Sequence, residues 1–422
     1  DLTPHLWKTA DYGASWTRID AGIARDAFTR VVREDPVRKG LLFAGTETGL
    51  WMSLDDGRGW QRFQRNLPAV PITDLAVKDG DLVVATQGRA FWILDDLSPL
   101  RQWTEEVAAA KTWLFTPPAA FRLRGGGDFA KAPQGAGQNA PAGALVSFWL
   151  KESPRESDVV TLAVLDGGKL LRYFSNEKRD EKLAAEAEEP LENRLELSAG
   201  LNRFAWDLRA LGPTLVPKAV LWGPSTGPRI LPGTYTVRLT AFGETRTVPL
   251  EVLPNPAVKQ TKEDLAKQAA FLGELYDTLS HVHGTVRNLR DAREQISTLA
   301  ERAKRSRVRS SVLDAAKEVD ARLLAVEEKL VNPKLKSPQD VLNFVPALDH
   351  QVVGLISAAS GADAPPTAGA LAYWAELKKT VDGALRDATR TLIDGVAAWN
   401  ARLADAGVPP VVIPARRIPT PR

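Results

Sequence analysis

Side chains suited to nucleophilic, acid–base or metal chemistry are scarce in this sequence. Its 422 residues include four histidines and no cysteine, which excludes disulfide bonds, thiolate zinc sites and cysteine nucleophiles. His281 and His283 are two positions apart, so on a helix they lie about 200° apart and cannot share a metal ion. His5 and His350 have no acidic or cysteine partner at ligand spacing. We expect all four to be surface or hydrogen-bonded core residues, and we predict no metal site.

Serine and phosphate chemistry also lack the sequence context that they need. Residues 223–227, Gly-Pro-Ser-Thr-Gly, have the spacing of Gly-x-Ser-x-Gly but lie in a proline-rich loop without the strand-to-helix context of a nucleophile elbow. The glycine-rich stretch 125–143 contains no Gly-x-x-x-x-Gly-Lys-Ser/Thr. The densest basic stretch, 302–309, falls between two helix patterns and is expected to be a solvated turn rather than a nucleic-acid surface. We therefore predict no catalytic residue, no cofactor and no nucleic-acid partner.

Aspartate recurs in a pattern that is present twice. Residues 9–16 and 53–60 both read Ser/Thr-x-Asp-x-Gly-x-x-Trp, and their first residues lie 44 positions apart, within the roughly 40–50 residues of one β-propeller blade. Asp can accept hydrogen bonds from backbone amides two residues on, Gly supplies positive φ, and Trp fills the apolar layer between blades. Asp11, Asp55 and Asp56 are expected to be turn residues, since so few carboxylates fall short of the roughly six to eight oxygen ligands of Ca²⁺.

This pattern resembles the Asp-box (BNR) repeat of sialidase-type and sortilin-type β-propellers. Residues 88–96 resemble the last blade of secreted sortilin-like proteins that are described as glycosyl hydrolase BNR repeat proteins. In that family the Asp box is a structural turn on the rim, so the resemblance implies a fold rather than an activity. A propeller needs about four blades or more, and we count about two and a half. The resemblance therefore implies the C-terminal part of such a protein, with upstream blades supplied by the same protein or by a separate fragment.

The same resemblance raises the alternative of a sialidase-like glycoside hydrolase. Such an enzyme needs paired carboxylates, or a tyrosine nucleophile with an acid partner and an arginine cluster. The only tyrosine of the N-terminal part is Tyr12, inside an Asp box. The other candidates there are Arg18, Arg25, Arg30, Arg33, Arg38, Arg89, Asp20 and Asp74. Because the arginines of those enzymes come from several blades of a complete ring, no catalytic role is transferred to any residue here.

The patterning predicts a multidomain fold of β and α parts. Residues 1–112 read as the last propeller blades, 113–143 as a linker or loop, and 144–255 as an Ig-like β-sandwich of short alternating strands. Residues 256–407 read as an antiparallel four-helix bundle, and 408–422 as an extended tail that lies against a neighbouring surface.

Helix signals are clear in the C-terminal part. A near capping box begins at Thr261, and a second helix start, Ser-Pro-Gln-Asp, begins at Ser337. This second start is expected to open a helix whose apolar stripe is Val341, Val345, Leu348, Val352 and Leu355. Apolar residues then recur at three-to-four spacing, most regularly over 371–403. The chain is 44% hydrophobic with a formal net charge of +3, and without an apolar run near 18 residues it is not expected to span a membrane.

The leading functional hypothesis is a non-catalytic recognition or scaffold part of an exported sortilin-like β-propeller protein, which binds a protein, peptide or glycan. The first alternative is an exo-sialidase-like hydrolase whose catalytic ring lies upstream of this chain. The second is a subunit of an exported multiprotein assembly. The family resemblance and the absence of cysteine favour a secreted, periplasmic or cell-surface bacterial location.

Overall fold

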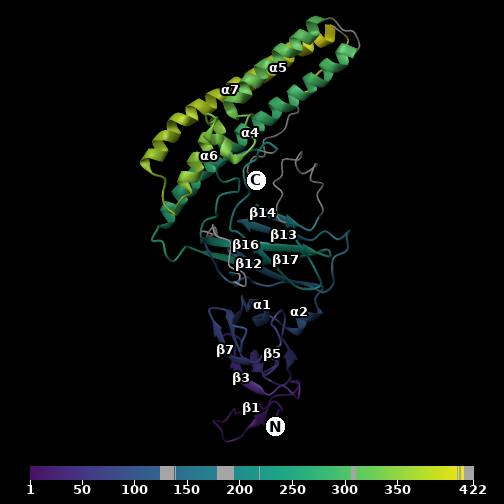
Figure 1. The fold of residues 1–422 in the computed structure, drawn as a ribbon, viewed down its shortest axis with the longest axis vertical. Coiled ribbons are helices and arrows are strands. Elements are labelled where there is room, and N and C mark those ends of the chain that lie inside the picture. The colour runs from purple at the N-terminus through teal and green to yellow at the C-terminus, as the bar shows by residue number, and fades with distance from the viewer. Residues whose placement is uncertain are drawn as a thin grey trace.

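The computed structural model describes residues 1–123, 137, 139–177, 194–217, 219–305, 310–405, 407 and 410–412. Three groups of elements follow one another along its long axis: small N-terminal sheets, two larger sheets, and a set of helices (Figure 1). The fold is therefore mixed β and α with several sheets, as the sequence predicts. Its described residues do not form a closed propeller.

Three small antiparallel sheets make up the N-terminal group. The first contains β1 (Trp7–Lys8) and β2 (Thr17–Arg18); the second β3 (Thr29–Glu34), β4 (Leu42–Thr46), β5 (Gly49–Ser53) and β6 (Gln61–Arg62); the third β7 (Ile72–Lys78), β8 (Asp81–Thr86) and β9 (Phe91–Leu94). Strand β4 is buried on both faces: Phe43 packs toward the third sheet, whereas Leu42 and Ala44 pack toward the first. The sheets are thus stacked side by side through shared apolar layers.

Two short helices that the sequence analysis did not predict follow β9. They are α1 (Ser98–Arg101) and α2 (Glu105–Ala109). The Thr104 hydroxyl accepts a hydrogen bond from the Val107 amide and so caps α2. Arg101 holds α1 against the second sheet, because its guanidinium lies 2.8 Å from the fully buried carboxylate of Asp35.

The central group consists of two sheets that share one apolar core. One has the order β10 (Thr112–Leu114), β12 (Ala144–Leu150), β15 (Gly200–Trp206). The other has the order β11 (Ala120–Phe121), β17 (Glu244–Leu253), β16 (Gly233–Ala241), β13 (Thr161–Asp166), β14 (Lys169–Ser175). Strand β16 shows the expected alternation, with Tyr235, Val237 and Leu239 buried between exposed residues.

Strands β10 and β11 come from the segment that the sequence analysis read as a linker. β10 pairs antiparallel with β12, and β11 pairs parallel with β17. The glycine-rich part of that segment, apart from residues 137 and 139–143, lies outside the described residues.

The helical group contains α4 (Lys262–Arg305), α5 (Ser310–Leu330), α6 (Leu348–Ala359) and α7 (Ala368–Asp405) around one apolar core. The cap predicted at Thr261 is present, since its hydroxyl accepts from the Asp264 amide at 3.1 Å. α4 and α5 run antiparallel, with Arg290 bound to Glu327 and Arg293 bound to Asp320. α6 is much shorter than the other three helices and packs against α4 (Figure 1).

The helix expected to begin at Ser337 and continue through Leu355 is wrong in its first part. The capping box of Ser337 and Asp340 forms, but it opens only a 3₁₀ turn, η1 (Pro338–Leu342). Pro346 disfavours helical backbone at the preceding residue, Val345, which is 87% exposed instead of part of a buried stripe. The α-helix begins only at Leu348.

Two further expectations fall partly on described residues. Of the basic stretch 302–309, residues 302–305 form the end of α4, and 306–309 lie outside the described residues. Of the tail, residues 410–412 lie against α7 and α4, where Val411 exchanges hydrogen bonds with the Asn400 side chain and Val412 with that of Gln295. In the part of the chain that is described, the helices are too short or too polar to cross a bilayer.

Candidate functional site

Both Asp boxes form the same hydrogen-bonded turn. Asp11 accepts a hydrogen bond from the Ser15 amide at 2.8 Å, and Asp55 accepts one from the Gly59 amide at 2.9 Å. The structural role predicted for these aspartates is confirmed. The expected reach of two residues is wrong, because the turn is wide enough to bring the amide four residues ahead onto the carboxylate.

The box backbone is left-handed at two successive positions. Gly13 and Gly57 have φ of 94° and 84°, as the sequence predicts. The preceding residues Tyr12 and Asp56 also have positive φ, 55° and 65°, which side chains rarely adopt. Asp56 forms an ion pair with Lys8 of the first sheet, so it ties two neighbouring units together rather than contributing to a cation site.

The two box tryptophans differ sharply in burial. Trp60 is 6% exposed, packs in the layer between the first two sheets, and donates its indole N–H to the Ile19 carbonyl at 2.5 Å. Trp16 of the first box is 58% exposed. The expected packing role is therefore confirmed for Trp60, which lies between two neighbouring sheets, and wrong for Trp16, which has no sheet packed over it in the described chain.

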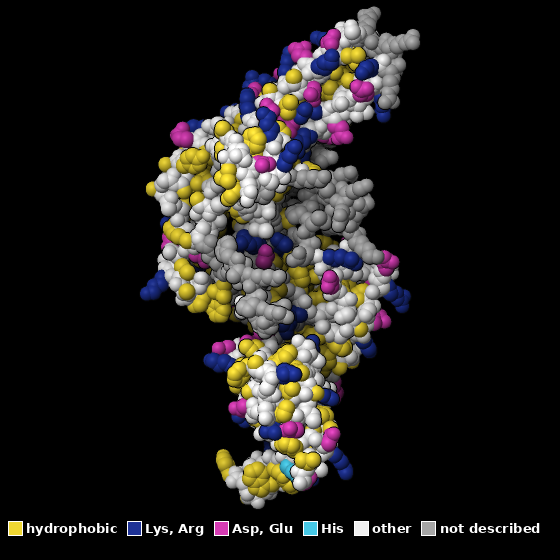
Figure 2. All heavy atoms as spheres, viewed as in Figure 1, with side chains coloured by type: hydrophobic (Ala, Val, Ile, Leu, Met, Phe, Trp, Pro, Cys, Tyr) yellow, Lys and Arg dark blue, Asp and Glu magenta, His cyan; other side chains and the backbone are white. Residues whose placement is uncertain are grey.

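Apolar side chains are exposed at both free ends of the N-terminal sheets. Trp7 lies in β1 of the first sheet and Trp16 directly precedes β2, whereas Phe91 and Ile93 lie on the outer face of β9, the edge strand of the third sheet. Figure 2 shows hydrophobic side chains in yellow at the N-terminal tip. These residues form what we call the open blade face.

The arginines and acids weighed for sugar chemistry do not converge. Three of the arginines form ion pairs on separate stretches of the N-terminal sheets: Arg18 with Asp20, Arg30 with Glu47, and Arg33 with Asp74. Arg38 donates to the Leu100 carbonyl, and Arg25 and Arg89 are exposed. Tyr12 is fully exposed. None of these side chains lines the arginine pocket described below.

His283 lies in the core between the helices and the loop that precedes β16. Its Nδ1 accepts a hydrogen bond from the Val216 amide at 3.2 Å, and its Nε2 lies 3.9 Å from Asp349 Oδ2. Burial lowers the pKa of His283 to about 4, and the nearby Asp349 carboxylate only partly opposes this. His283 is therefore a neutral, hydrogen-bonded core residue, as predicted, whereas His281 is exposed.

His350 and His5 each have an acidic partner, contrary to our expectation. His350 Nδ1 lies 2.9 Å from Asp349 Oδ1, and His5 Nε2 lies 2.9 Å from Asp1 Oδ2. The sequence analysis overlooked both partners: Asp349 directly precedes His350, and Asp1 lies four positions before His5. Among the described residues, no group of three or more His, Cys, Asp or Glu side chains could hold a metal ion.

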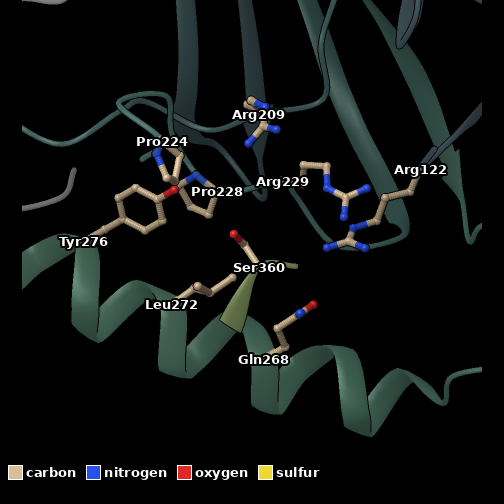
Figure 3. Close-up of a pocket in the computed structure, with 9 residues that line it drawn as sticks. All are labelled: Arg122, Arg209, Pro224, Pro228, Arg229, Gln268, Leu272, Tyr276 and Ser360. Atoms are coloured by element: carbon tan, nitrogen blue, oxygen red, sulfur yellow. The ribbon is translucent and has the colours of Figure 1, made fainter. Parts of the chain in front are cut away.

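A pocket of about 160 Å³ lies where the central sheets meet the helices, and we call it the arginine pocket (Figure 3). Arg209 and Arg229 reach it from an isolated antiparallel bridge after β15 and before β16. The bridge is flanked by hydrogen bonds from Ala210 N to Pro228 O and from Ile230 N to Leu208 O, both 2.9 Å. Directly opposed residues point to the same face, so the two arginines share one side of the strand pair.

The third arginine enters from β11. Arg122 follows this strand, donates its Nε–H to the Ile230 carbonyl at 2.7 Å, and is only 4% exposed. Its guanidinium and that of Arg229 both contact Oδ1 of Asp363, at 2.5 and 2.6 Å. Asp363 lies between α6 and α7, so this buried ion cluster joins the sheets to the helices.

The helices supply the opposite wall of the arginine pocket. Gln268 and Tyr276 come from α4, and Ser360 caps α6; the Ser360 hydroxyl points into the space below the arginines (Figure 3). Gln268 is fixed by donating to the Ala359 and Ala362 carbonyls. The loop 223–227, considered above for a serine nucleophile, contributes Pro224 to the rim.

The side chains that line this pocket are cationic or neutral. Burial raises the pKa of Tyr276, although nearby Arg209 opposes the shift. An activated tyrosine nucleophile would need the opposite shift. The described residues that line the pocket include three arginines and no acid, so an acid–base pair is not assembled there. The sequence reading missed this site, because its arginines are far apart in the chain and follow no local motif.

Comparisons with known proteins give little guidance. No protein-family model matches the sequence, and no curated protein matches it. Two solved structures that resemble it are of the extracellular domain of BT4673 from B. thetaiotaomicron, described as a putative one-component system and as a putative hybrid two-component system, at 11% and 10% sequence identity. The TM-scores are 0.18 and 0.19; the matches cover 59% and 60% of this chain but only 28% and 29% of those chains. Such low scores carry no argument about fold or function.

Proposed function

We propose that this chain is the non-catalytic recognition and scaffold part of an exported sortilin-like β-propeller protein, which binds a protein, peptide or glycan. The observation that carries the proposal is the open blade face: the stacked small sheets, the first two of which each contain an Asp-box turn, expose aromatic side chains at both free ends. In this assignment the N-terminal sheets are propeller blades, the two central sheets are an Ig-like sandwich, and α4–α7 are a four-helix bundle.

The partner that fits the open blade face is a set of further Asp-box blades, from the same protein or from a separate fragment. In this assignment Trp60 lies at such a blade interface, since it is buried between two consecutive units and hydrogen-bonded to the earlier one. Trp16 occupies the same position of the repeat and is exposed. A further blade would give Trp16 an environment like that of Trp60 and would pair the free edge of β9.

Recognition is favoured over glycoside hydrolysis by the placement of the charged groups. The arginines weighed for sugar chemistry are paired with carboxylates, bonded to a backbone carbonyl or exposed, and Tyr12 points into solvent on a turn. A hydrolase of the sialidase type would need such groups gathered around one sugar. Rigid β-scaffolds commonly carry binding loops, so a secreted, periplasmic or cell-surface binding protein is the proposal that fits these residues.

The test begins with the native protein, by intact mass and peptide mapping. We expect further Asp-box repeats, either covalently joined to this chain or in a stoichiometric complex with it. Hydrogen exchange should then show the β1, β2 and β9 amides protected in that native protein and exposed in the isolated chain. A native protein with no further Asp-box repeat would contradict the proposal.

The same native protein separates recognition from hydrolysis. It is incubated with a fluorogenic sialoside and screened on glycan and peptide arrays. Saturable binding without release of the sugar is the expected result. Sugar release that survives removal of contaminating activities would establish the sialidase-like alternative, and the absence of any bound glycan or peptide would contradict recognition.

A further inference from the structure

We infer that the arginine pocket binds an oxyanion of the sulfate or phosphate type. This inference does not depend on the propeller assignment, because the pocket lies between the central sheets and the helices. It rests on three features: opposed arginines on one bridge, hydrogen-bond donors that enter from different sides, and a cavity of suitable size.

The bridge places two like charges in the closest pairing that an antiparallel ladder allows. The flanking hydrogen bonds make Arg209 and Arg229 a non-hydrogen-bonded pair, in which side chains approach more closely than in a hydrogen-bonded pair. Like charges directly opposite one another are destabilising. An anion held between the two guanidiniums would convert this repulsion into two charge-assisted contacts.

The backbone on both sides of the Arg209–Arg229 bridge is conformationally strained or closely packed. Leu208, the residue before it, has φ of 58°, a conformation that bulky side chains rarely adopt. Gly227, opposite, approaches so closely that a Cβ there would lie 2.1 Å from the Ala210 carbonyl oxygen. Arg209 also donates to the Gly227 carbonyl at 2.9 Å. Strained positions of this kind are typical of binding sites, where the surrounding structure enforces them.

The buried carboxylate of Asp363 is the counter-ion of Arg122 and Arg229, the other two arginines of the pocket. Asp363 contacts Arg122 and Arg229, and it holds their guanidiniums in place. Arg209 has Asp207 as its acidic neighbour, at 3.8 Å and half exposed to solvent. Arg209 is therefore the arginine that can move toward a ligand without breaking the buried ion cluster.

The directions of the hydrogen-bond donors and the size of the pocket favour a tetrahedral oxyanion. Arg209 approaches from the sheet side, Arg122 and Arg229 from one flank, and the Ser360 hydroxyl from the helix side (Figure 3). A planar carboxylate presents its oxygens in one plane, whereas sulfate or phosphate presents oxygens to all of these donors. The volume of about 160 Å³ is close to the roughly 150 Å³ of a cavity that holds benzene. It therefore has room for a sulfate or phosphate group.

The test is isothermal titration calorimetry of the full chain with sodium sulfate, sodium phosphate and a monosaccharide sulfate, at constant ionic strength maintained with sodium chloride. Sodium acetate is the planar comparison. The variants are Arg209→Gln, Arg209→Lys and, as a matched control on an exposed position of β16, Arg238→Gln. Circular dichroism checks that each variant is folded; Arg209 is partly exposed, so its replacement should be tolerated.

We expect sulfate or phosphate to bind the wild type and the Arg238→Gln variant alike. The Arg209→Gln variant should bind about tenfold or more weakly, which corresponds to one charge-assisted hydrogen bond. Arg209→Lys should give an intermediate affinity, because lysine keeps the charge but loses the planar fork. Tighter binding of the sulfate ester than of inorganic sulfate would indicate a group on a larger ligand, and the reverse would indicate the free ion.

Three results would overturn the inference. The first is no heat of binding for any of the three oxyanion probes. The second is equal affinity for acetate, which would remove the tetrahedral preference. The third is an Arg209→Gln variant that is folded and binds as the wild type does.

Discussion

Several buried polar side chains lie where the central sheets and their loops meet the helices. Arg122, Gln268, His283, Asp349 and Asp363 are all less than about a tenth exposed, and each has a hydrogen bond or an ion pair. Burying a polar group without such a partner would cost about 1–3 kcal/mol. These contacts therefore fix how the sheets and helices meet, and single changes among them should have measurable consequences.

His283 should make the protein sensitive to acid. Its pKa is lowered from 6.5 in the unfolded chain to about 4 in the fold, so between these pH values the unfolded state binds the proton and the folded state does not. The stability present above pH 6.5 is lost as the pH falls toward 4, by about 3 kcal/mol. His283→Gln keeps an acceptor for the Val216 amide but cannot titrate, so urea unfolding at several pH values should show this loss reduced.

The control for this prediction is His281→Gln, two residues away and exposed. This variant should keep the pH dependence of the wild type. A His283→Gln variant with the full wild-type dependence would assign the acid sensitivity to other groups, such as the carboxylates.

At the level of elements, the sequence predicts structure well where local signals act alone. Period-two alternation located the long strands of the central sheets, and the cap at Thr261 located the start of α4. Sequence-based prediction failed where another residue overrode a local signal: Pro346 stops the helix that Ser337 should have opened. It also failed where strands depend on remote partners, as with β11, whose pairing with β17 bridges more than a hundred residues.

The two Asp-box tryptophans provide a test, within one chain, of packing between neighbouring small sheets. Trp60→Ala should lower the free energy of unfolding by about 3–5 kcal/mol, because it removes a buried indole and its hydrogen bond. Trp16→Ala, at the same position of the first box, should change it by about 0.5 kcal/mol or less in the isolated chain. Chemical denaturation followed by circular dichroism measures both. Equal losses would show that Trp16 is packed in solution.

The contact between α4 and α5 depends on one buried carboxylate. Glu327 is 1% exposed and accepts hydrogen bonds from Arg290 at 2.7 Å and Arg293 at 2.8 Å. Glu327→Gln should destabilise the chain by about 1–3 kcal/mol, since both arginines are partly solvated and so lose only part of the pairing energy. Glu318→Gln, which breaks an exposed i, i+4 pair with Arg322 on the same helix, should have almost no effect in thermal unfolding.

At the scale of the whole molecule, the arginine pocket is a product of assembly. Its charged side chains come from the segment after β11, from both sides of the bridge and, through Asp363, from the connection between the last two helices. None of the three arginines belongs to a local sequence motif. The patterns that predict blades, strands and helices therefore do not predict the pocket. Only the packing of the sheets against the helices brings these charges together.

Asp363→Asn tests this junction and the pocket together. The change keeps the side-chain shape but leaves Arg122 and Arg229 buried without their shared carboxylate, which should cost about 3–5 kcal/mol. Because Asp363 joins two groups of elements, calorimetry should show the helices and the central sheets unfolding at separate temperatures. Millimolar sulfate at constant ionic strength should restore part of the loss, since it can take the place of the missing carboxylate. Asp79→Asn, on an exposed turn, gives the general salt effect. Restoration no greater than in that control would separate a purely structural arginine cluster from an anion site.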